Sequence, residues 1–112
     1  MNTTTIAQGG VATVTLDTTN LSWDIGKFFR HQIQVTGMGV GNTVTIGGTP
    51  TGGSGSTDIV GSAVSDGDHV VVTPDSGLFT NFVLTFSVPA GTADILISSY
   101  DSTTHSPSAQ VI

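Results

Sequence analysis

Apolar and polar residues alternate with a period of two along much of this chain. In NFVLTFSV, residues 81–88, every even-numbered residue is large and apolar, while three of the four odd-numbered residues are polar. The same alternation occurs in VATVTL (11–16), HQIQVT (31–36) and TVTIG (43–47). A period of two is typical of β-strands with one buried face, and no segment has the period of an amphipathic helix. The chain is therefore predicted to be all-β.

Turn signals separate these predicted strands. Asp66-Gly67 is the strongest of them and predicts a two-residue hairpin turn, while residues 37–42 (GMGVGN) and 89–92 (PAGT) predict two further connections. HVVVT and ADILISSY have apolar residues on both faces, as central strands do. About seven to eight short strands result. This number predicts an antiparallel two-sheet β-sandwich of jelly-roll or immunoglobulin-like type, and a small barrel is less favoured.

Two segments do not fit the strand pattern. GGTPTGGSGST, residues 47–57, is glycine-rich and apolar-free, so it is expected to be a flexible surface loop or a wide hairpin tip. Residues 17–32 are too long for a hairpin turn and are expected to cross between the sheets, with one helical turn after Asn20. We expect residues 1–10 to form an N-terminal arm, residues 11–101 the sandwich domain and residues 102–112 a C-terminal tail.

The charge of the chain restricts its partners. All eight acidic residues are Asp, and only Lys27 and Arg30 oppose them, so the formal net charge is -6. Such a charge repels phosphate backbones and anionic lipid, which argues against nucleic-acid and membrane-surface binding. No apolar run is long enough to span a membrane and the start lacks the features of a signal peptide, so we expect a soluble, unprocessed product.

Candidate metal sites have simpler explanations. Asp66, Asp68 and Asp75 could supply oxygen ligands to Ca²⁺, but no bidentate Glu follows them and turn chemistry explains the first two. The three histidines lie far apart in the sequence, without the spacing of a zinc site: His31, His69 and His105. We therefore predict no metal and no cofactor.

Catalytic patterns are also missing from the sequence. No G-x-S-x-G elbow occurs, although Ser, His and Asp are all present. A pair of aspartates could act on a glycoside, but aromatic platforms for sugar are scarce, with only Trp23 and Tyr100 of the usual stacking types outside the Phe-rich core. We therefore predict that the chain is not an enzyme.

Two long segments, FRHQIQVTGMGVGNTVTIGGTPTGG (29–53) and DGDHVVVTPDSGLFTNFVLTFSVPAGTADILISSY (66–100), resemble small β-sandwich virion proteins of tailed bacteriophages. The resemblance covers residues 28–100 and consists of alternating strands joined by Gly/Thr-rich tips. It implies a structural role in the particle: decorating or cementing the head, or building a tail, neck or fibre part. It brings no functional residues with it.

This resemblance leads to an expected function. We expect a structural protein made in the host cytoplasm and placed on the virion surface, where it binds the major capsid protein or another virion protein and its own copies. A head decoration or cement protein is the first expectation. The alternatives are a tail or neck component and a carbohydrate-binding or adhesion module, which would require solvent exposure of Trp23 and Tyr100.

The predicted interface combines the only lysine and the only arginine of the sequence with the two adjacent phenylalanines that lie between them. Adjacent strand residues point to opposite faces, so Phe28 and Phe29 cannot both enter one core, and one of them is expected to face outward between Lys27 and Arg30. The alternative is that both rings cap the open end of the sandwich and the cations only offset Asp24. Residues 1–8 are expected to contact a neighbour. The full predicted interface is Lys27, Phe28, Phe29, Arg30, Trp23, Thr3, Thr4, Thr5 and Ile6.

Overall fold

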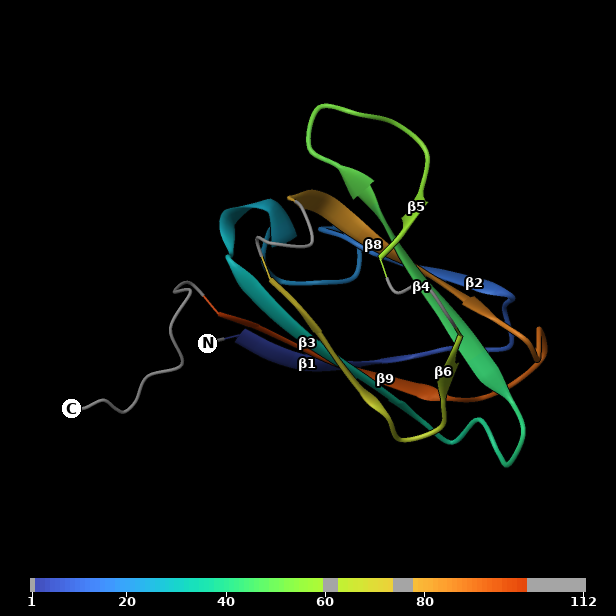
Figure 1. Cartoon of the computed structure of the whole chain (residues 1–112). Coiled ribbons are helices and arrows are strands. Elements are labelled where there is room, and N and C mark those ends of the chain that lie inside the picture. Colours follow the sequence, from blue (N-terminus) through green and yellow to red (C-terminus); the bar gives the residue numbers. More distant parts are fainter. Residues whose placement is uncertain (1, 60–62, 74–77, 101–112) are drawn as a thin grey trace.

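The structure is a computed structural model that describes residues 2–59, 63–73 and 78–100. These residues contain nine strands and one short 3-10 helix, η1, joined by turns and loops (Figure 1). They are β1 (Asn2–Ala7), β2 (Thr13–Leu16), η1 (Ile25–Lys27), β3 (Arg30–Thr36), β4 (Thr43–Pro50), β5 (Thr57–Asp58), β6 (Val64–Ser65), β7 (His69–Val72), β8 (Phe79–Phe86) and β9 (Asp94–Tyr100). No helix among the described residues is both long enough and apolar enough to cross a membrane.

The strands form two antiparallel sheets packed face to face. One sheet has the order β1-β9-β3-β7 and the other β2-β8-β4-β5, with β6 also paired to β4. The chain passes from one sheet to the other at each of its first three connections and again between β6, β7, β8 and β9. This is the order of a jelly roll, since an immunoglobulin-like sandwich would pair consecutive strands within its sheets. The predicted all-β sandwich is confirmed. It has nine strands, more than the seven to eight expected, because two segments of only two residues, β5 and β6, also pair as strands.

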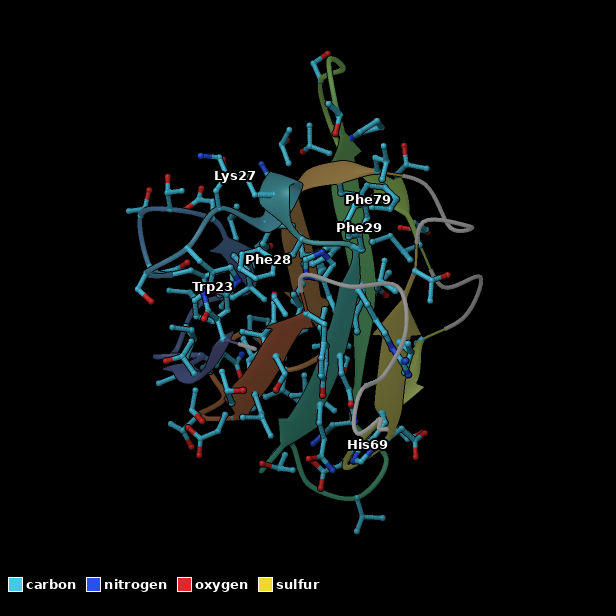
Figure 2. All side chains as sticks on the ribbon, turned by 90° about the vertical axis from the view of Figure 1, so that its left-hand side faces the viewer. Trp23, Lys27, Phe28, Phe29, His69 and Phe79 are labelled. Carbon is cyan, nitrogen blue, oxygen red and sulfur yellow. The ribbon has the colours of Figure 1, made fainter. Side chains whose placement is uncertain are left out.

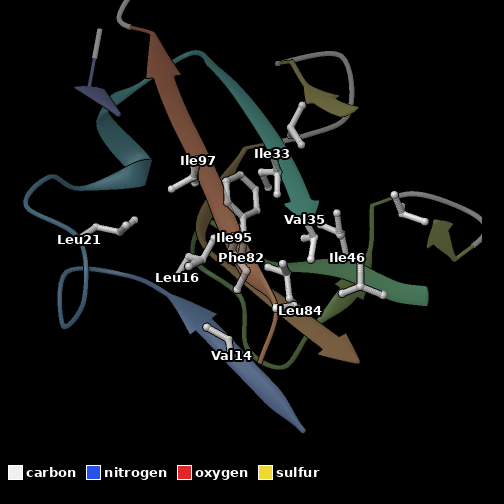
Figure 3. Packing of buried hydrophobic residues seen from close by; sticks show 14 of the residues in the cluster. Val14, Leu16, Leu21, Ile33, Val35, Ile46, Phe82, Leu84, Ile95 and Ile97 are labelled. Carbon is white, nitrogen blue, oxygen red and sulfur yellow. The ribbon is translucent and has the colours of Figure 1, made fainter. Parts of the chain in front are cut away.

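The core lies between the sheets and follows the alternation seen in the sequence (Figure 3). In β8, Phe82, Leu84 and Phe86 are buried, and the residues between them face outward or are half-buried. Ile95 and Ile97 of β9 are fully buried against them from the other sheet. The alternating strands thus supply the apolar inner faces, whose burial drives folding.

The Asp66-Gly67 turn forms, but the predicted hairpin around it is wrong. The Asp68 N–H donates to the Ser65 carbonyl over 3.1 Å, and Gly67 has a φ of 83°. The strands on its two sides nevertheless belong to different sheets, because β6 pairs with β4 and β7 pairs with β3. The connections at residues 37–42 and 89–92 also pass between sheets. These turns therefore join the two layers.

Of the two segments outside the strand pattern, the crossover has the expected form, whereas residues 47–50 of the expected loop are the end of strand β4. Residues 47–57 belong to the wide β4–β5 hairpin, whose tip is residues 51–56 (Figure 1). The connection from β2 to β3 crosses between the sheets and contains a single helical turn, η1. Asp24 caps η1 by accepting the Gly26 N–H at 2.9 Å. Leu21, Trp23 and Ile25 of this crossover are buried.

The expected N-terminal arm is part of the sandwich. Asn2–Ala7 is strand β1, at the edge of its sheet and paired along its whole length with β9. Gln8 is buried after it, donating to the carbonyls of Val11 and Val88 and accepting from the Ala93 N–H. The expected boundary at residue 11 is therefore too late. The expected tail, 102–112, lies outside the described residues.

Candidate functional site

One end of the sandwich carries a group of partly exposed apolar side chains. Phe29 is 49% exposed and Leu78 is 59% exposed. Beside them, Phe28 and Phe79 are half-buried and pack against the core (Figure 2). A hollow of about 10 Å³, enough for roughly one water molecule, is lined by Gly26, Phe28, Phe29, His31, Val72, Thr73, Leu78 and Phe79. We call Phe28, Phe29, Leu78 and Phe79 the apolar end.

Local backbone structure sets the two phenylalanines apart. The Phe28 N–H caps η1 by donating to the Ile25 carbonyl at 3.1 Å, and the Phe29 N–H donates to the Tyr100 carbonyl at 3.0 Å. The first bond holds Phe28 beside the core, and the second fixes Phe29 at the start of β3. The prediction that one of the two rings faces outward is confirmed, and the outward ring is Phe29.

Both cations lie next to the apolar end. Lys27 is exposed at the last residue of η1, and the guanidinium carbon of Arg30 lies 5.9 Å from the centre of the Tyr100 ring. Neither forms an ion pair within the described part of the chain. The Asp24 carboxylate accepts the Gly26 N–H and forms no ion pair with either cation. The structure thus brings Lys27, Phe29 and Arg30 together at one end of the sandwich.

His31 lies beneath this surface, inside the sandwich. Its ring Nδ1 is 2.7 Å from the Ser99 hydroxyl, and the ring meets Phe82 edge to face with centroids 5.0 Å apart. Burial lowers the pKa of His31 from 6.5 to about 4, against a weaker raising effect of a hydrogen bond to the Phe28 backbone. His31 is therefore neutral at pH 7 and adds no charge to the apolar end.

Trp23 is not part of an accessible surface, so its predicted place in the interface is wrong. Its side chain is buried in the crossover, with 7% exposed, and its Nε1 has no hydrogen-bond partner in the part of the chain that the structure describes. Tyr100 is half-buried beside Arg30. The aromatic platform that a sugar-binding surface would need is therefore not built from these two residues.

The threonines of β1 form a second surface. Thr3 and Thr5 are exposed, whereas Thr4 and Ile6 are half-buried on the inner side of the strand. The Thr3 and Ser98 hydroxyls are 3.0 Å apart across the β1–β9 pair. Since β9 lies between β1 and β3, the predicted interface divides into two regions, the apolar end with its cations and the edge strand β1.

Leu78 and Phe79 were missed from the sequence as members of the site. The Thr51 N–H donates to the Leu78 carbonyl at 2.9 Å, which ties the start of β8 to the end of β4. Both residues thereby reach the end of the sandwich where η1 lies, since β8 also contacts η1. The only sequence signal was their apolar character directly before a strand, which by itself does not distinguish a core residue from a surface residue.

The remaining candidate chemistries are not assembled in the described ranges. No three His, Asp or Glu side chains within residues 2–59, 63–73 and 78–100 gather as a metal site requires. The Asp66 carboxylate accepts the N–H of Met38, in the connection between β3 and β4, at 2.9 Å. His69 lies on the outer face of its sheet beside Gln32, at 3.2 Å, whereas His31 is buried. Asp75 and His105 lie outside the described residues.

A shallow depression of about 100 Å³ lies on the outer face of the β1-β9-β3-β7 sheet. Its lining is mostly polar: Gln32, Gln34, His69, Leu96 and Ser98. Several of these polar groups already bond within the chain. The Gln34 amide donates to the Gly67 carbonyl at 2.9 Å, and Gln32 contacts His69. The depression therefore offers few free donors to a ligand.

A solved structure shares the fold of this chain. The crystal structure of SPBc2 prophage-derived protein YomS superposes with a TM-score of 0.54 and 12% sequence identity, over 88% of this chain and 93% of that one. No protein-family model matches the sequence, and no curated protein matches it significantly. The structural likeness shows a common sandwich fold, and that neighbour derives from a prophage.

Proposed function

We propose that this chain is a non-enzymatic structural protein of a bacteriophage virion: a head decoration or cement protein that binds the capsid lattice and neighbouring copies at the particle surface. The observation that carries the proposal is the apolar end, where the exposed Phe29 ring lies beside Lys27 and Arg30, which form no ion pair among the described residues of an acidic chain. The fold shared with a prophage-derived protein supports the phage part of the proposal.

The apolar end has the composition of a binding anchor. Large aromatic side chains contribute most to protein–protein affinity when their surroundings exclude water. Phe29 and Leu78 each expose about half of their surface, while Phe28 and Phe79 hold them on a packed base. A partner that covers this end would bury the exposed apolar surface with little rearrangement of the sandwich, which keeps the entropic cost of binding low.

The two cations give this contact its charge preference. The chain carries a formal net charge of -6, so an identical or similarly acidic partner is repelled everywhere except near Lys27 and Arg30. The Arg30 guanidinium lies over the Tyr100 ring and pairs with no carboxylate among the described residues, and its planar fork can bind a partner's carboxylate through two hydrogen bonds. An acidic surface on the capsid protein is the complementary partner.

A tail or neck component is the second candidate, because the same anchor could attach to any virion protein. The carbohydrate-binding or adhesion module is less favoured, since Trp23 is buried and Tyr100 is half-buried under Arg30. The absence of an enzymatic role is part of the proposal and rests on the lack of a recognisable catalytic grouping in the sequence.

The test is the protein composition of purified phage particles whose genome encodes this chain. Mass spectrometry of intact particles, separated heads and separated tails measures its copy number in each. A decoration protein is expected in many copies per head and accessible to surface labelling. A few copies confined to the tail fraction would favour the second candidate. Absence from all particle fractions would contradict a virion role.

A further inference from the structure

Strand β1 has a free edge whose hydrogen-bonding groups can be assigned residue by residue. β1 pairs with β9 in a register where residue numbers sum to 101, as in Ile6 opposite Ile95. The Gln8 N–H donates to the Ala93 carbonyl at 2.8 Å, and the Gly10 N–H donates to the Gly91 carbonyl at 3.0 Å, both in that register. Bonded pairs alternate along an antiparallel ladder, so the even-numbered residues of β1 bond to β9.

The odd-numbered residues of β1 therefore direct their backbone groups away from the sheet. Thr3, Thr5 and Ala7 each present an N–H and a carbonyl oxygen to the open side, and no other strand of the described residues pairs with β1 there. Their side chains are also exposed, on the outer face of the sheet. The inner side is closed by Ile6, which packs against the core.

This edge lacks the features that normally prevent pairing between sheets. Natural edge strands are protected by lysine, proline, inward charges, bulges or shortness. The six residues of β1, NTTTIA, contain no charged residue and no proline, and the register with β9 is continuous. The edge of the other sheet on this side, β2, has only four residues. β1 is thus the longer free edge of the two.

We infer that β1 binds the β1 strand of a second copy of this chain, in antiparallel orientation around a two-fold axis at Thr5. In this register Thr5 lies opposite Thr5 of the copy, and Thr3 lies opposite its Ala7. Three outward N–H groups from each copy give six hydrogen bonds, so every free group of Thr3, Thr5 and Ala7 is used. The two four-stranded sheets become one eight-stranded sheet.

Side-chain chemistry is compatible with this self-pairing. The threonines at the axis are cross-strand neighbours, an arrangement that stabilises antiparallel pairs through hydroxyl contacts. Asp94, opposite Ala7, is the one acidic residue within β1 and β9 as the structure describes them. In the proposed register the two Asp94 residues lie about 20 Å apart, from the strand spacing and rise, which exceeds the screening length of about 8 Å at physiological salt. The net negative charge therefore opposes the contact only weakly.

The inference deepens the proposed function, because it names the strand through which neighbouring copies contact one another. The inference about β1 and the proposed virion function can fail independently of each other. A protein that does not pair through β1 can still attach to particles through the apolar end, and a protein without any virion role can still pair through β1. The experiment therefore uses the purified full-length chain without particles.

The test combines sedimentation velocity with amide hydrogen exchange over a range of concentrations. Wild-type protein is expected to shift from monomer to dimer as concentration rises. The amides of Thr3, Thr5 and Ala7 should exchange freely in the dilute protein and become protected in the dimer, while those of Thr4 and Ile6 stay protected throughout. This alternation is the signature of pairing at the free edge.

Two variants of one residue separate backbone pairing from other effects. Thr5→Pro removes only an outward N–H, which an edge strand tolerates, and it deletes both hydrogen bonds at the axis; dimerisation should weaken by about tenfold or more. Thr5→Val keeps the N–H and should dimerise within a few fold of wild type. Thermal unfolding of the dilute proteins checks that both variants remain folded. Thr3→Pro is a second outward position if Thr5→Pro fails to fold.

Three outcomes would overturn the inference. Wild-type protein could remain monomeric at millimolar concentration. The odd-numbered amides could be protected at every concentration, which would mean that the edge is covered within one chain. Dimers could form while these amides stay unprotected, or with equal affinity in a folded proline variant, which would place the contact elsewhere.

Discussion

The Nδ1 atom of His31 lies 2.7 Å from the hydroxyl oxygen of Ser99, inside the sandwich and between paired strands β3 and β9. Both residues are buried and stand opposite each other in the register. The imidazole is thus a neutral polar group in an apolar core, with Phe82 against its edge. Protonation of this ring would place a charge where burial penalises it.

The stability of the protein should therefore fall as the pH decreases from 7 to 4. The pKa of His31 is about 4 in the folded chain and 6.5 when unperturbed, so the unfolded chain binds the proton first. The contribution of neutral His31 to the free energy of unfolding is fully present well above pH 6.5. Its loss should lower that free energy by about 3 kcal/mol by pH 4. Urea unfolding at pH 7, 5.5 and 4.5 measures this loss.

The matched control for this pH dependence is His31→Gln, which keeps a hydrogen-bonding side chain opposite Ser99 but does not titrate. Its unfolding free energy should be nearly constant between pH 7 and 4.5. Wild-type stability that is equally constant over this range would show that the His31 pKa is not lowered.

Gly48 is required because strand β4 passes close to the Phe79 ring. A Cβ at position 48 would lie 2.7 Å from a ring carbon of Phe79 and 3.0 Å from the Ile59 side chain. Gly48→Ala should lower the free energy of unfolding by about 1–3 kcal/mol through overpacking. Gly53→Ala, which meets only ordinary contacts at 3.4 Å or more, is the control. Equal stability of the two variants would argue against this packing.

Gly67 is required for its backbone conformation alone. Its φ is 83° and no atom lies within 4 Å of an added Cβ, so a substitution there meets strain and no collision. Gly67→Val should cost roughly 1 kcal/mol or more, because a β-branched residue disfavours positive φ. Gly67→Asn should be milder, since Asn tolerates this region. Thermal unfolding that leaves the Val variant unchanged would contradict the turn geometry.

Gln8 joins two interstrand connections through its buried amide. Its Nε2 donates to the carbonyls of Val11 at 2.9 Å and Val88 at 2.8 Å, and its Oε1 accepts the Ala93 N–H at 3.2 Å. Gln8→Ala leaves these groups without partners and should destabilise the protein by about 1–3 kcal/mol. Gln8→Glu should be at least as damaging, because a carboxylate cannot donate to the two carbonyls. A wild-type melting temperature for both variants would refute this role.

The sequence predicted the fold where local patterns determine structure. The alternation in residues 81–88 gave the buried face of β8, and the length of the β2–β3 connection indicated a crossover. The Asp66-Gly67 signal predicted a turn correctly but not its strand partners, since a turn is local whereas sheet membership depends on distant pairing. The burial of Trp23 in the crossover likewise depends on contacts that are distant in the sequence.

The candidate site was predictable only in part for a related reason. Phe29, Lys27 and Arg30 are adjacent in the sequence, so their grouping needed no tertiary information. Leu78 joins them only through the hydrogen bond from Thr51 and the packing of β8 beside η1. Tryptophan is a residue type that is common in interfaces, but Trp23 is buried within the crossover. Burial of a single aromatic residue cannot be read from its type.

Arg30 should contribute to attachment in a way that depends on salt. Arg30→Asp reverses a charge that has no acidic partner in the described chain and should weaken binding to particles most at low ionic strength, where screening is least. The domain should stay folded, because the half-buried side chain contributes mainly its contact with Tyr100. Folded Arg30→Asp protein that attaches normally in low and in moderate salt would remove Arg30 from the interface.

Reattachment to particles tests the central claim most directly. Phage particles from a strain lacking this gene are mixed with purified wild-type, Phe29→Ser or Val40→Ser protein, and the bound fraction is measured by co-sedimentation. Val40 is a fully exposed apolar residue in the loop after the far end of β3, so it controls for loss of surface hydrophobicity. Wild type and Val40→Ser should saturate the particles, while Phe29→Ser should bind about thirtyfold more weakly, as loss of an interface anchor does. Wild-type protein that does not bind, or Phe29→Ser protein that binds as tightly as wild type, would contradict the account.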